Sequence, residues 1–193
     1  MEDNEFYTYI PGYLDGSLFE QLLKEINPLV NFYWGVAYNK VYIAKRLSCL
    51  FDEFPHEKSD QKDVLETTSK IQSFNWKSSS LICTIKNKLE EDFDESFDYC
   101  LAHLYRDGND TIAYHRDSEA METPVVSLSF GATRKFRFRE IDKTSGYCKE
   151  FLLKSGDLIL MKVGCQSVYK HSVPVEKSVK EPRINLTFRK YDS

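Results

Sequence analysis

The chain has 193 residues, of which 41% are hydrophobic and 14% aromatic, so it can bury a substantial core and is neither fibrous nor disordered. Residues 1–100 carry a net charge of −8 and residues 101–193 carry +4, which gives −4 overall. This acidity excludes a strong general binder of phosphate backbones, while the basic second half is compatible with a nucleic-acid partner.

The cysteines and the N-terminal residues indicate in which cellular compartment we expect the protein. Five cysteines without any Cys-x-x-Cys argue against a disulfide framework and against a thiolate zinc site. No apolar leader follows Met1, and no aliphatic stretch approaches the roughly 18 residues of a membrane span. We expect a soluble, intracellular, monomeric protein, nuclear if the source is eukaryotic, with one domain over residues 1–193.

The N-terminal half predicts strands and two helices. Residues 6–10 predict a short strand, and Asp15 or Ser17 then caps a helix that runs to about Ile26. Residues 32–43 are aromatic and β-branched, which indicates a strand pair.

A charged segment separates this strand pair from the second helix. Residues 52–73 have few apolar anchors, so we expect a long loop. One of Ser78, Ser79 or Ser80 caps the next helix, which should pack on the outside of a sheet. Its apolar side consists of Leu81, Ile82, Ile85 and Leu89.

From Phe97 onward, short strands alternate with turns and no helical crossover intervenes. Residues 99–105, 124–130, 134–139 and 147–153 each show strand patterns. Such a succession indicates an antiparallel double-stranded barrel. We expect Phe136 and Phe138 to point inward and Arg137 and Arg139 outward.

Three residues in this half are candidate metal ligands. His115 and Asp117 are two apart, so on an extended strand or its frayed end both side chains leave the same face. His171 follows after enough residues for several antiparallel strands to bring the chain back. Two imidazoles and one carboxylate leave coordination positions open, an arrangement suited to non-haem Fe(II). A solvated loop pair or a helix N-cap is the simpler interpretation of His-x-Asp alone.

The segment 183–189 predicts a strand with two different faces. Ile184, Leu186 and Phe188 form an apolar face. Arginine forks on the other face could pair bidentately with a carboxylate, although a solvent-facing strand surface is the alternative. The residues of this polar face are Arg183, Asn185, Thr187 and Arg189.

These motifs in this order, with 156–161 preceding the second histidine, resemble the AlkB family of Fe(II)- and 2-oxoglutarate-dependent dioxygenases. The resemblance covers roughly residues 99–190 and is nearest to the eukaryotic-type DNA-repair branch. It implies a mainly β fold with flanking helices: a double-stranded β-helix, or jelly-roll, core over about 97–190, buttressed by two N-terminal helices. It also implies a nucleotide-recognition lid over about 36–75.

The resemblance implies Fe(II) bound by His115, Asp117 and His171. It further implies 2-oxoglutarate chelated to the iron, with Arg183 on its remote carboxylate. His103 stands where the family has an asparagine; an imidazole can donate to a carboxylate, but it could also compete for metal or be an ordinary buried histidine. The other implied cosubstrate residues are Tyr105, Asn185, Thr187 and Arg189.

The implied partner is alkylated DNA or RNA. Tyr38 matches a finger that fills the gap left by an extruded base, Arg46 a DNA contact, and Glu119 an acidic residue near the target base. Each residue fits an ordinary structural role as well as this functional one. Tyr38 could be an aromatic that packs a hairpin, Arg46 a solvated arginine and Glu119 an exposed loop glutamate. Ser118 departs from the second aspartate of many repair members. Candidate residues for stacking on the base are Phe51, Phe54 and Tyr169.

The implied activity is oxidative demethylation of bases such as 1-methyladenine or 3-methylcytosine. O₂ and 2-oxoglutarate become CO₂ and succinate, the N-methyl group is hydroxylated, and formaldehyde leaves. The alternatives are a 2-oxoglutarate oxygenase acting on RNA or protein, and a non-catalytic reader of modified nucleic acid. A zinc hydrolase could use the same three ligands but would not require Arg183.

Overall fold

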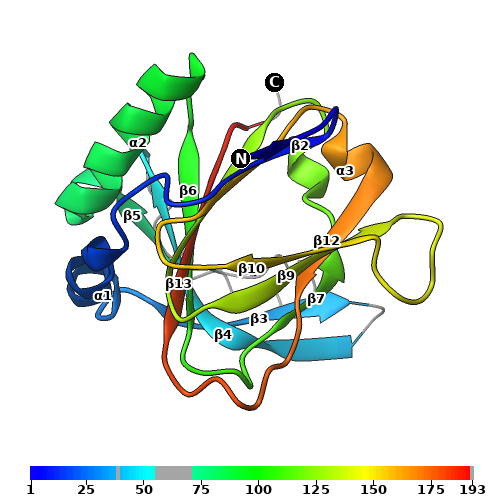
Figure 1. Cartoon of the computed structure of the whole chain (residues 1–193). Coiled ribbons are helices and arrows are strands. Elements are labelled where there is room, and N and C mark those ends of the chain that lie inside the picture. The colour runs from blue at the N-terminus through cyan, green and yellow to red at the C-terminus, as the bar shows by residue number, and fades with distance from the viewer. Residues whose placement is uncertain (38–39, 55–70, 192–193) are drawn as a thin grey trace.

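Two β-sheets face each other in the computed structural model, which describes residues 1–37, 40–54 and 71–191 (Figure 1). The larger sheet has the order β1-β2-β11-β8-β13-β6-β4-β3, and β5 pairs in parallel with β4. The smaller sheet has the order β10-β9-β12-β7. The larger sheet's strands are β1 Glu2–Asp3, β2 Tyr7–Ile10, β3 Asn31–Ala37, β4 Lys40–Asp52, β5 Ser73–Asn75, β6 Tyr99–Tyr105, β8 Val125–Gly131, β11 Leu158–Met161 and β13 Arg183–Arg189. The smaller sheet's strands are β7 Ile112–His115, β9 Arg134–Glu140, β10 Lys149–Leu153 and β12 Tyr169–Val173.

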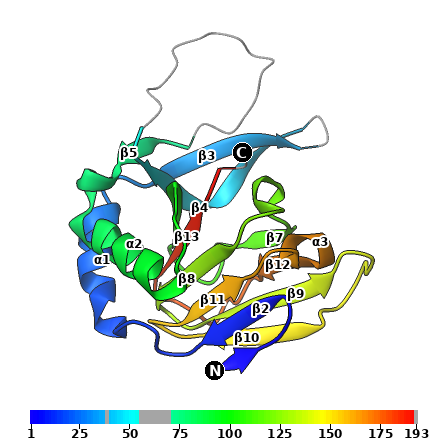
Figure 2. The same ribbon diagram turned by 90° about the horizontal axis from the view of Figure 1, so that it is seen from above.

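Helices α1 (Phe19–Ile26) and α2 (Ser80–Phe93) lie along the outer side of the larger sheet (Figures 1 and 2). The predicted cap of α2 is confirmed, because Ser79 Oγ accepts a hydrogen bond from the N–H of Ile82. Asp15 accepts one from the backbone N–H of Ser17, but it caps the short 3-10 helix that precedes α1, and α1 itself begins at Phe19 without a side-chain cap. The remaining short helices are η1 Gly16–Leu18, η2 Trp76–Ser78, η3 Ser118–Ala120 and α3 Cys165–Val168.

Two apolar clusters hold the fold together. The first fills the space between the larger sheet and the two helices, and its members include Leu22, Ile82, Leu128 and Phe188. The second lies between the sheets around Phe138. Burial of each such large apolar side chain contributes about 1.5–3 kcal/mol, so the two clusters fix the position of the sheets.

Strand β13 lies at the centre of the larger sheet, between β6 and β8, and pairs antiparallel with both. The alternation predicted for it is confirmed. Ile184, Leu186 and Phe188 belong to the helix-side core, whereas the alternate residues point toward the smaller sheet. All seven residues are buried. The polar face of β13 is therefore not a solvent-facing surface but one wall of an interior space.

The expected fold is confirmed: a mainly β jelly roll, flanked by α1 and α2. In β9, Phe136 and Phe138 point inward, while Arg137 and Arg139 lie on the other face above the rings of Tyr147 and Tyr114. No helix in the described ranges is long and apolar enough to cross a membrane.

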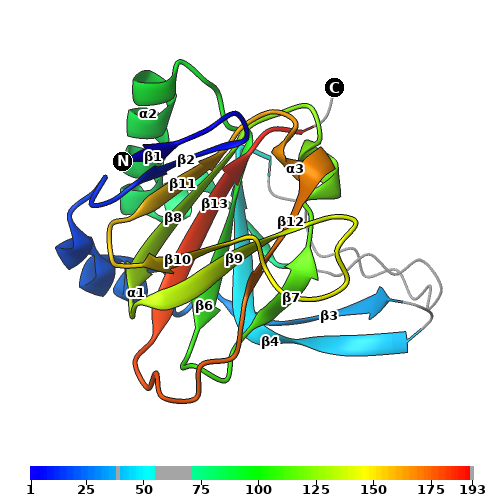
Figure 3. The same ribbon diagram turned by 45° about the vertical axis from the view of Figure 1, so that its right-hand side comes forward.

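Strands β3 and β4 form an antiparallel pair that reaches past β7 (Figures 2 and 3). Most of the loop predicted over 52–73, and Tyr38 with it, lies outside the described residues. At the ends of that prediction, β4 continues through Asp52, and β5 begins at Ser73.

Candidate metal and cosubstrate site

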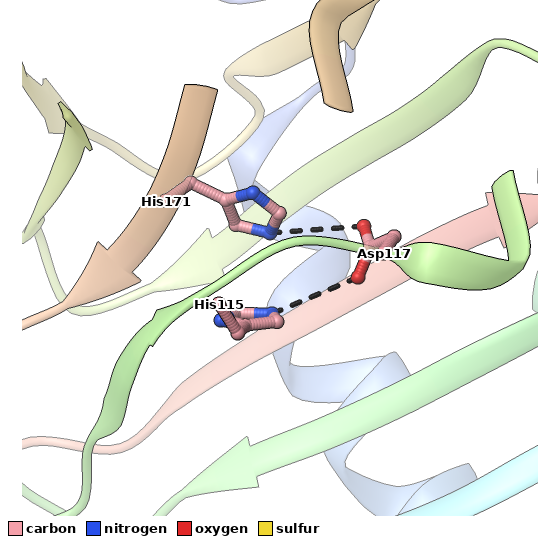
Figure 4. A group of neighbouring side chains, drawn as sticks. All are labelled: His115, Asp117 and His171. Atoms are coloured by element: carbon pink, nitrogen blue, oxygen red, sulfur yellow. Dashed lines mark ion pairs between the residues drawn. The ribbon is translucent and has the colours of Figure 1, made fainter. Parts of the chain in front are cut away.

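The three predicted metal ligands come together at one end of the smaller sheet. Strands β7 and β12 pair antiparallel with His115 directly opposite His171, and Asp117 follows two residues after β7. Figure 4 shows the three side chains pointing toward one another from these two segments. The pairing of the two strands thus brings together His115 and His171, which are 56 positions apart.

The distances in this cluster fit a single bound ion. Nε2 of His115 lies 3.7 Å from Asp117 Oδ1, and Nε2 of His171 lies 3.7 Å from Asp117 Oδ2. One ligand atom from each residue falls within 4.8 Å of the others. Oδ2 of Asp117 is buried and has no hydrogen-bond partner in the described part of the chain. A buried carboxylate oxygen without a partner is costly unless a cation binds it, so the residues present fit a metal.

Neighbouring groups orient these ligands. His115 donates from Nδ1 to the carbonyl of Ala113 at 2.9 Å, which leaves the lone pair of Nε2 free for a metal. Gln166 Oε1 in α3 accepts the backbone N–H of Asp117 at 3.0 Å. Arg189 donates from Nη2 to Asp117 Oδ1 at 2.8 Å. Arg189 therefore holds the carboxylate of Asp117, and Gln166 holds the backbone of the same residue.

The protonation states favour metal binding. Burial, together with the neighbouring His115, lowers the pKa of His171 to about 3. Burial also lowers the pKa of His115. Burial alone would raise the pKa of Asp117, but Arg189 and the two imidazoles outweigh it, and the pKa is lowered. At neutral pH the site offers two neutral imidazoles and one carboxylate, the forms that coordinate.

A cavity lies between the two sheets beside these ligands. Both metal-ligand histidines line it, and so do residues of β6 and β13 on the larger sheet. The lining residues from β6 and β13 are His103, Tyr105, Asn185, Thr187 and Arg189. The structure thus brings five of the six predicted cosubstrate residues to one cavity.

Arg183, the sixth, lies beside the cavity wall, with its guanidinium carbon 5.1 Å from the centre of the Tyr105 ring. It is only 1% exposed, and Nη2 donates to Ser129 Oγ at 2.8 Å. Nε and Nη1 are buried without a partner among the described residues. Burial lowers its pKa to about 10, so the guanidinium stays charged at neutral pH. A buried cation with unused donors suits a carboxylate ligand.

Asn185 and Arg189 have protein partners of their own. Asn185 donates from Nδ2 to Ser127 Oγ at 2.9 Å and to the carbonyl of Leu128 at 2.8 Å. Arg189 forms ion pairs with both Asp117 and Glu119. In the geometry seen here, these two residues hold the cavity wall and the metal-ligand carboxylate in place.

The burial and contacts of His103 and Arg46 bear on the alternative roles predicted for each residue. His103 Nδ1 lies 2.7 Å from Ser48 Oγ, and its imidazole is not one of the clustered metal ligands. Arg46 is 6% exposed and donates to the hydroxyl of Tyr33 at 2.7 Å and to the carbonyl of Thr111 at 3.4 Å. The interpretation of Arg46 as a solvated arginine is therefore wrong.

The three candidates for stacking on the base differ in how exposed they are. Phe51 is fully buried in the helix-side core, so it cannot stack on a base, and that interpretation is wrong. Tyr169 packs against Phe6 and Phe138. Phe54 is 80% exposed. Glu119 is half exposed and contacts Arg189.

Sequence reasoning missed three residues that support the site: Ser48, Gln166 and Arg134. Arg134 is as buried as Arg183, but it donates to Glu176 and to three backbone carbonyls. It is a structural arginine that holds the segment before β13. Ser48 alternates with the apolar residues of β4, and this period of two was the available signal.

Comparison with known proteins agrees with this geometry. Residues 6–189 match the model of the 2OG-Fe(II) oxygenase superfamily. The alpha-ketoglutarate-dependent dioxygenase alkB homolog 3 of Bos taurus is 32% identical over 197 residues, covering 93% of this chain and 64% of that protein. The DNA oxidative demethylase ALKBH2 of Homo sapiens is 39% identical over 105 residues, covering 50% of this chain and 40% of that protein.

The chain belongs to the AlkB family of 2OG-Fe(II) oxygenases. Its cofactors are accordingly Fe(II) and 2-oxoglutarate. An uncharacterized protein of Acanthamoeba polyphaga mimivirus is 27% identical over 97% of this chain and 94% of its own length. The solved structure of OsALKBH1 shares the AlkB-type fold, with a TM-score of 0.67 over 98% of this chain and all of that one, at 16% identity. This chain spans 64% of the length of the alkB homolog 3 proteins of cow, mouse and human.

Proposed function

We propose that this AlkB-family chain is an oxidative demethylase of alkylated nucleic-acid bases of the 1-methyladenine or 3-methylcytosine type. The observation that carries the proposal is the cluster of His115, Asp117 and His171, whose ligand atoms lie within 4.8 Å of one another beside a cavity. The buried, incompletely paired guanidinium of Arg183 lies next to that cavity. A metal site alone fits many enzymes, whereas the added cation favours a keto-acid cosubstrate.

Each residue of the site has its own role in the proposed reaction. His115, Asp117 and His171 would hold Fe(II), which when bound supplies the O₂ and 2-oxoglutarate chemistry that oxidises a methyl group. Arg183 would bind the remote carboxylate of 2-oxoglutarate and so orient it. Arg189 fixes the Asp117 carboxylate through its ion pair. None of these roles needs a protein nucleophile, because the hydroxymethylated base releases formaldehyde by itself.

A nucleic-acid substrate is supported by the relatives and by charge. One relative is named a DNA oxidative demethylase, and residues 101–193, which carry the site, have a net charge of +4. Glu119 and the segment 36–75 are proposed to contact the substrate. Glu119 is suited to this because its carboxylate is half exposed and forms an ion pair with Arg189, which also pairs with the metal ligand Asp117.

Two measurements test the proposal. Anaerobic titration with Fe(II) and 2-oxoglutarate should produce the visible charge-transfer band of the chelate. Formaldehyde release should then be compared on methylated single-stranded DNA, duplex DNA, RNA and peptide at equal methyl concentration. We expect release on nucleic acid and none on peptide.

The alternatives give different results in the same assays. Turnover on peptide alone would indicate a protein oxygenase. Binding of methylated DNA without iron binding would indicate a reader. Hydrolysis supported by Zn²⁺ and independent of 2-oxoglutarate would indicate a zinc hydrolase.

A further inference from the structure

A buried hydroxyl–imidazole pair lines the cavity on the side of the larger sheet. Ser48 of β4 lies opposite His103 of β6 in the strand register, and Ser48 Oγ is 2.7 Å from His103 Nδ1. Both side chains are at least 95% buried. His103 lines the cavity that the metal-ligand histidines share. Because Nδ1 is engaged by Ser48, Nε2 is the ring nitrogen left for a ligand.

The surroundings keep this imidazole neutral. Burial lowers the pKa of His103 well below its usual range, and the nearby cations Arg46, Arg189 and Arg183 lower it further. A neutral imidazole carries one N–H, on either Nδ1 or Nε2. The tautomer therefore decides whether His103 offers the cavity a donor or a lone pair.

We propose that Ser48 donates its hydroxyl hydrogen to His103 Nδ1, which fixes the tautomer with the proton on Nε2 and makes His103 a hydrogen-bond donor to the cosubstrate. Ser48 is thus a positioning residue for 2-oxoglutarate. The inference rests on the proposed function, since it assigns the cavity an anionic ligand. A carboxylate only accepts hydrogen bonds, so a lone pair on Nε2 would repel it, whereas an N–H would bind it.

The first test needs no substitution. In metal-free protein labelled with ¹⁵N at histidine, the ¹⁵N shifts and two-bond couplings of the imidazoles report which nitrogen carries the proton. We expect protonated Nε2 and unprotonated Nδ1 at His103. A ring protonated at Nδ1 overturns the proposal, whatever the enzyme does.

The second test measures binding of 2-oxoglutarate by calorimetry in the presence of Mn²⁺, which replaces the redox-active iron. Ser48→Ala should weaken binding about tenfold, since one hydrogen bond to a charged ligand loses its orientation. Ser48→Thr keeps the hydroxyl and should stay within about threefold of wild type.

A double-mutant cycle separates positioning from a general structural effect. In His103→Asn, the amide donates without any choice of tautomer, so adding Ser48→Ala should change the affinity less than about twofold. An equal loss in both backgrounds, or no loss in wild type, refutes the role of Ser48. If wild type binds Mn²⁺ but no 2-oxoglutarate, it is the proposed function that fails, and the tautomer measurement still stands.

Discussion

The two faces of the larger sheet are built from the same strands but have opposite properties. Toward α1 and α2, β13 presents Ile184, Leu186 and Phe188, all fully buried in an apolar cluster. Toward the smaller sheet, the same strand presents two arginines, an asparagine and a threonine, all buried too. Several polar atoms of this cavity face lack partners among the described residues, among them two guanidinium nitrogens of Arg183.

This difference separates stability from function along one strand. Apolar burial on the helix side stabilises the fold by about 25 cal/mol for each Å² removed from water. Buried polar atoms without partners destabilise it by about 1–3 kcal/mol each. Such atoms are retained where a bound ligand supplies the missing hydrogen-bond partner. We therefore expect ligands to bind at the cavity face. If this division is right, substitutions on the two faces should affect different measurements.

The largest effect is expected at the cavity face from His171→Ala. Removing one of three metal ligands should abolish 2-oxoglutarate-dependent formaldehyde release, because the remaining His115 and Asp117 cannot hold the ion in the same geometry. Turnover assays with added Fe(II) check this, and circular dichroism confirms that the variant is folded. Retained turnover would refute the metal assignment.

On the helix face, Phe188→Ala should lower the free energy of unfolding by about 3–5 kcal/mol, because the ring packs between Trp76 and Phe97. Urea unfolding measures this loss. The folded protein should bind 2-oxoglutarate with an affinity within about twofold of wild type. A tenfold weaker affinity would show that the two faces are not independent.

The two fully buried arginines give a matched pair of substitutions. Arg183→Met should weaken binding of 2-oxoglutarate by about 2–3 kcal/mol, close to a hundredfold, with little loss of stability, because two of its three guanidinium nitrogens lack partners among the described residues. Arg134→Met should instead reduce stability by about 3–5 kcal/mol, since Glu176 and three carbonyls lose their donor. Calorimetry and urea unfolding should therefore rank the two variants in opposite orders.

The stability of the metal-free protein should depend on pH through the cavity face. The folded pKa of His171 is about 3, below its usual 6.5, so the unfolded chain binds the proton more tightly. This contribution is complete above pH 6.5 and is lost as the pH falls toward 3, at up to about 1.4 kcal/mol per pH unit. Urea unfolding with a chelator at pH 7, 6 and 5 should show the decrease. The slope should be shallower in His171→Ala, and a flat profile in wild type would contradict the assignment.

The smallest effect is expected for Glu119→Gln at the edge of the cavity. Its ion pair with Arg189 is half exposed, so stability should change by less than about 1 kcal/mol. Binding of Mn²⁺ and 2-oxoglutarate should be unchanged. Lower turnover on methylated DNA alone would support a substrate contact for Glu119, and unchanged turnover would remove it.

The sequence by itself determined local features: where several strands and helices lie, and which side chains of a strand share a face. The spacing of His115 and Asp117 and the alternation along 183–189 are local patterns, and a period of two specifies which side chains share a face. The helix caps at Asp15 and Ser79 are local for the same reason. For β4 the strand pair predicted over 32–43 stopped short of Ser48 and Phe51, and only the structure places these two residues on opposite faces of one strand.

What covers each face was decided only by the tertiary structure. Whether Arg183 or Arg134 keeps free donors depends on Ser129, Glu176 and backbone carbonyls from distant segments. Likewise, Arg46 resembles a solvated cation in the sequence, but it is buried because Tyr33 and Thr111 close over it. Partners far apart along the chain meet only when the two sheets close, and that closure, not local propensity, turns a polar strand face into the wall of a binding cavity.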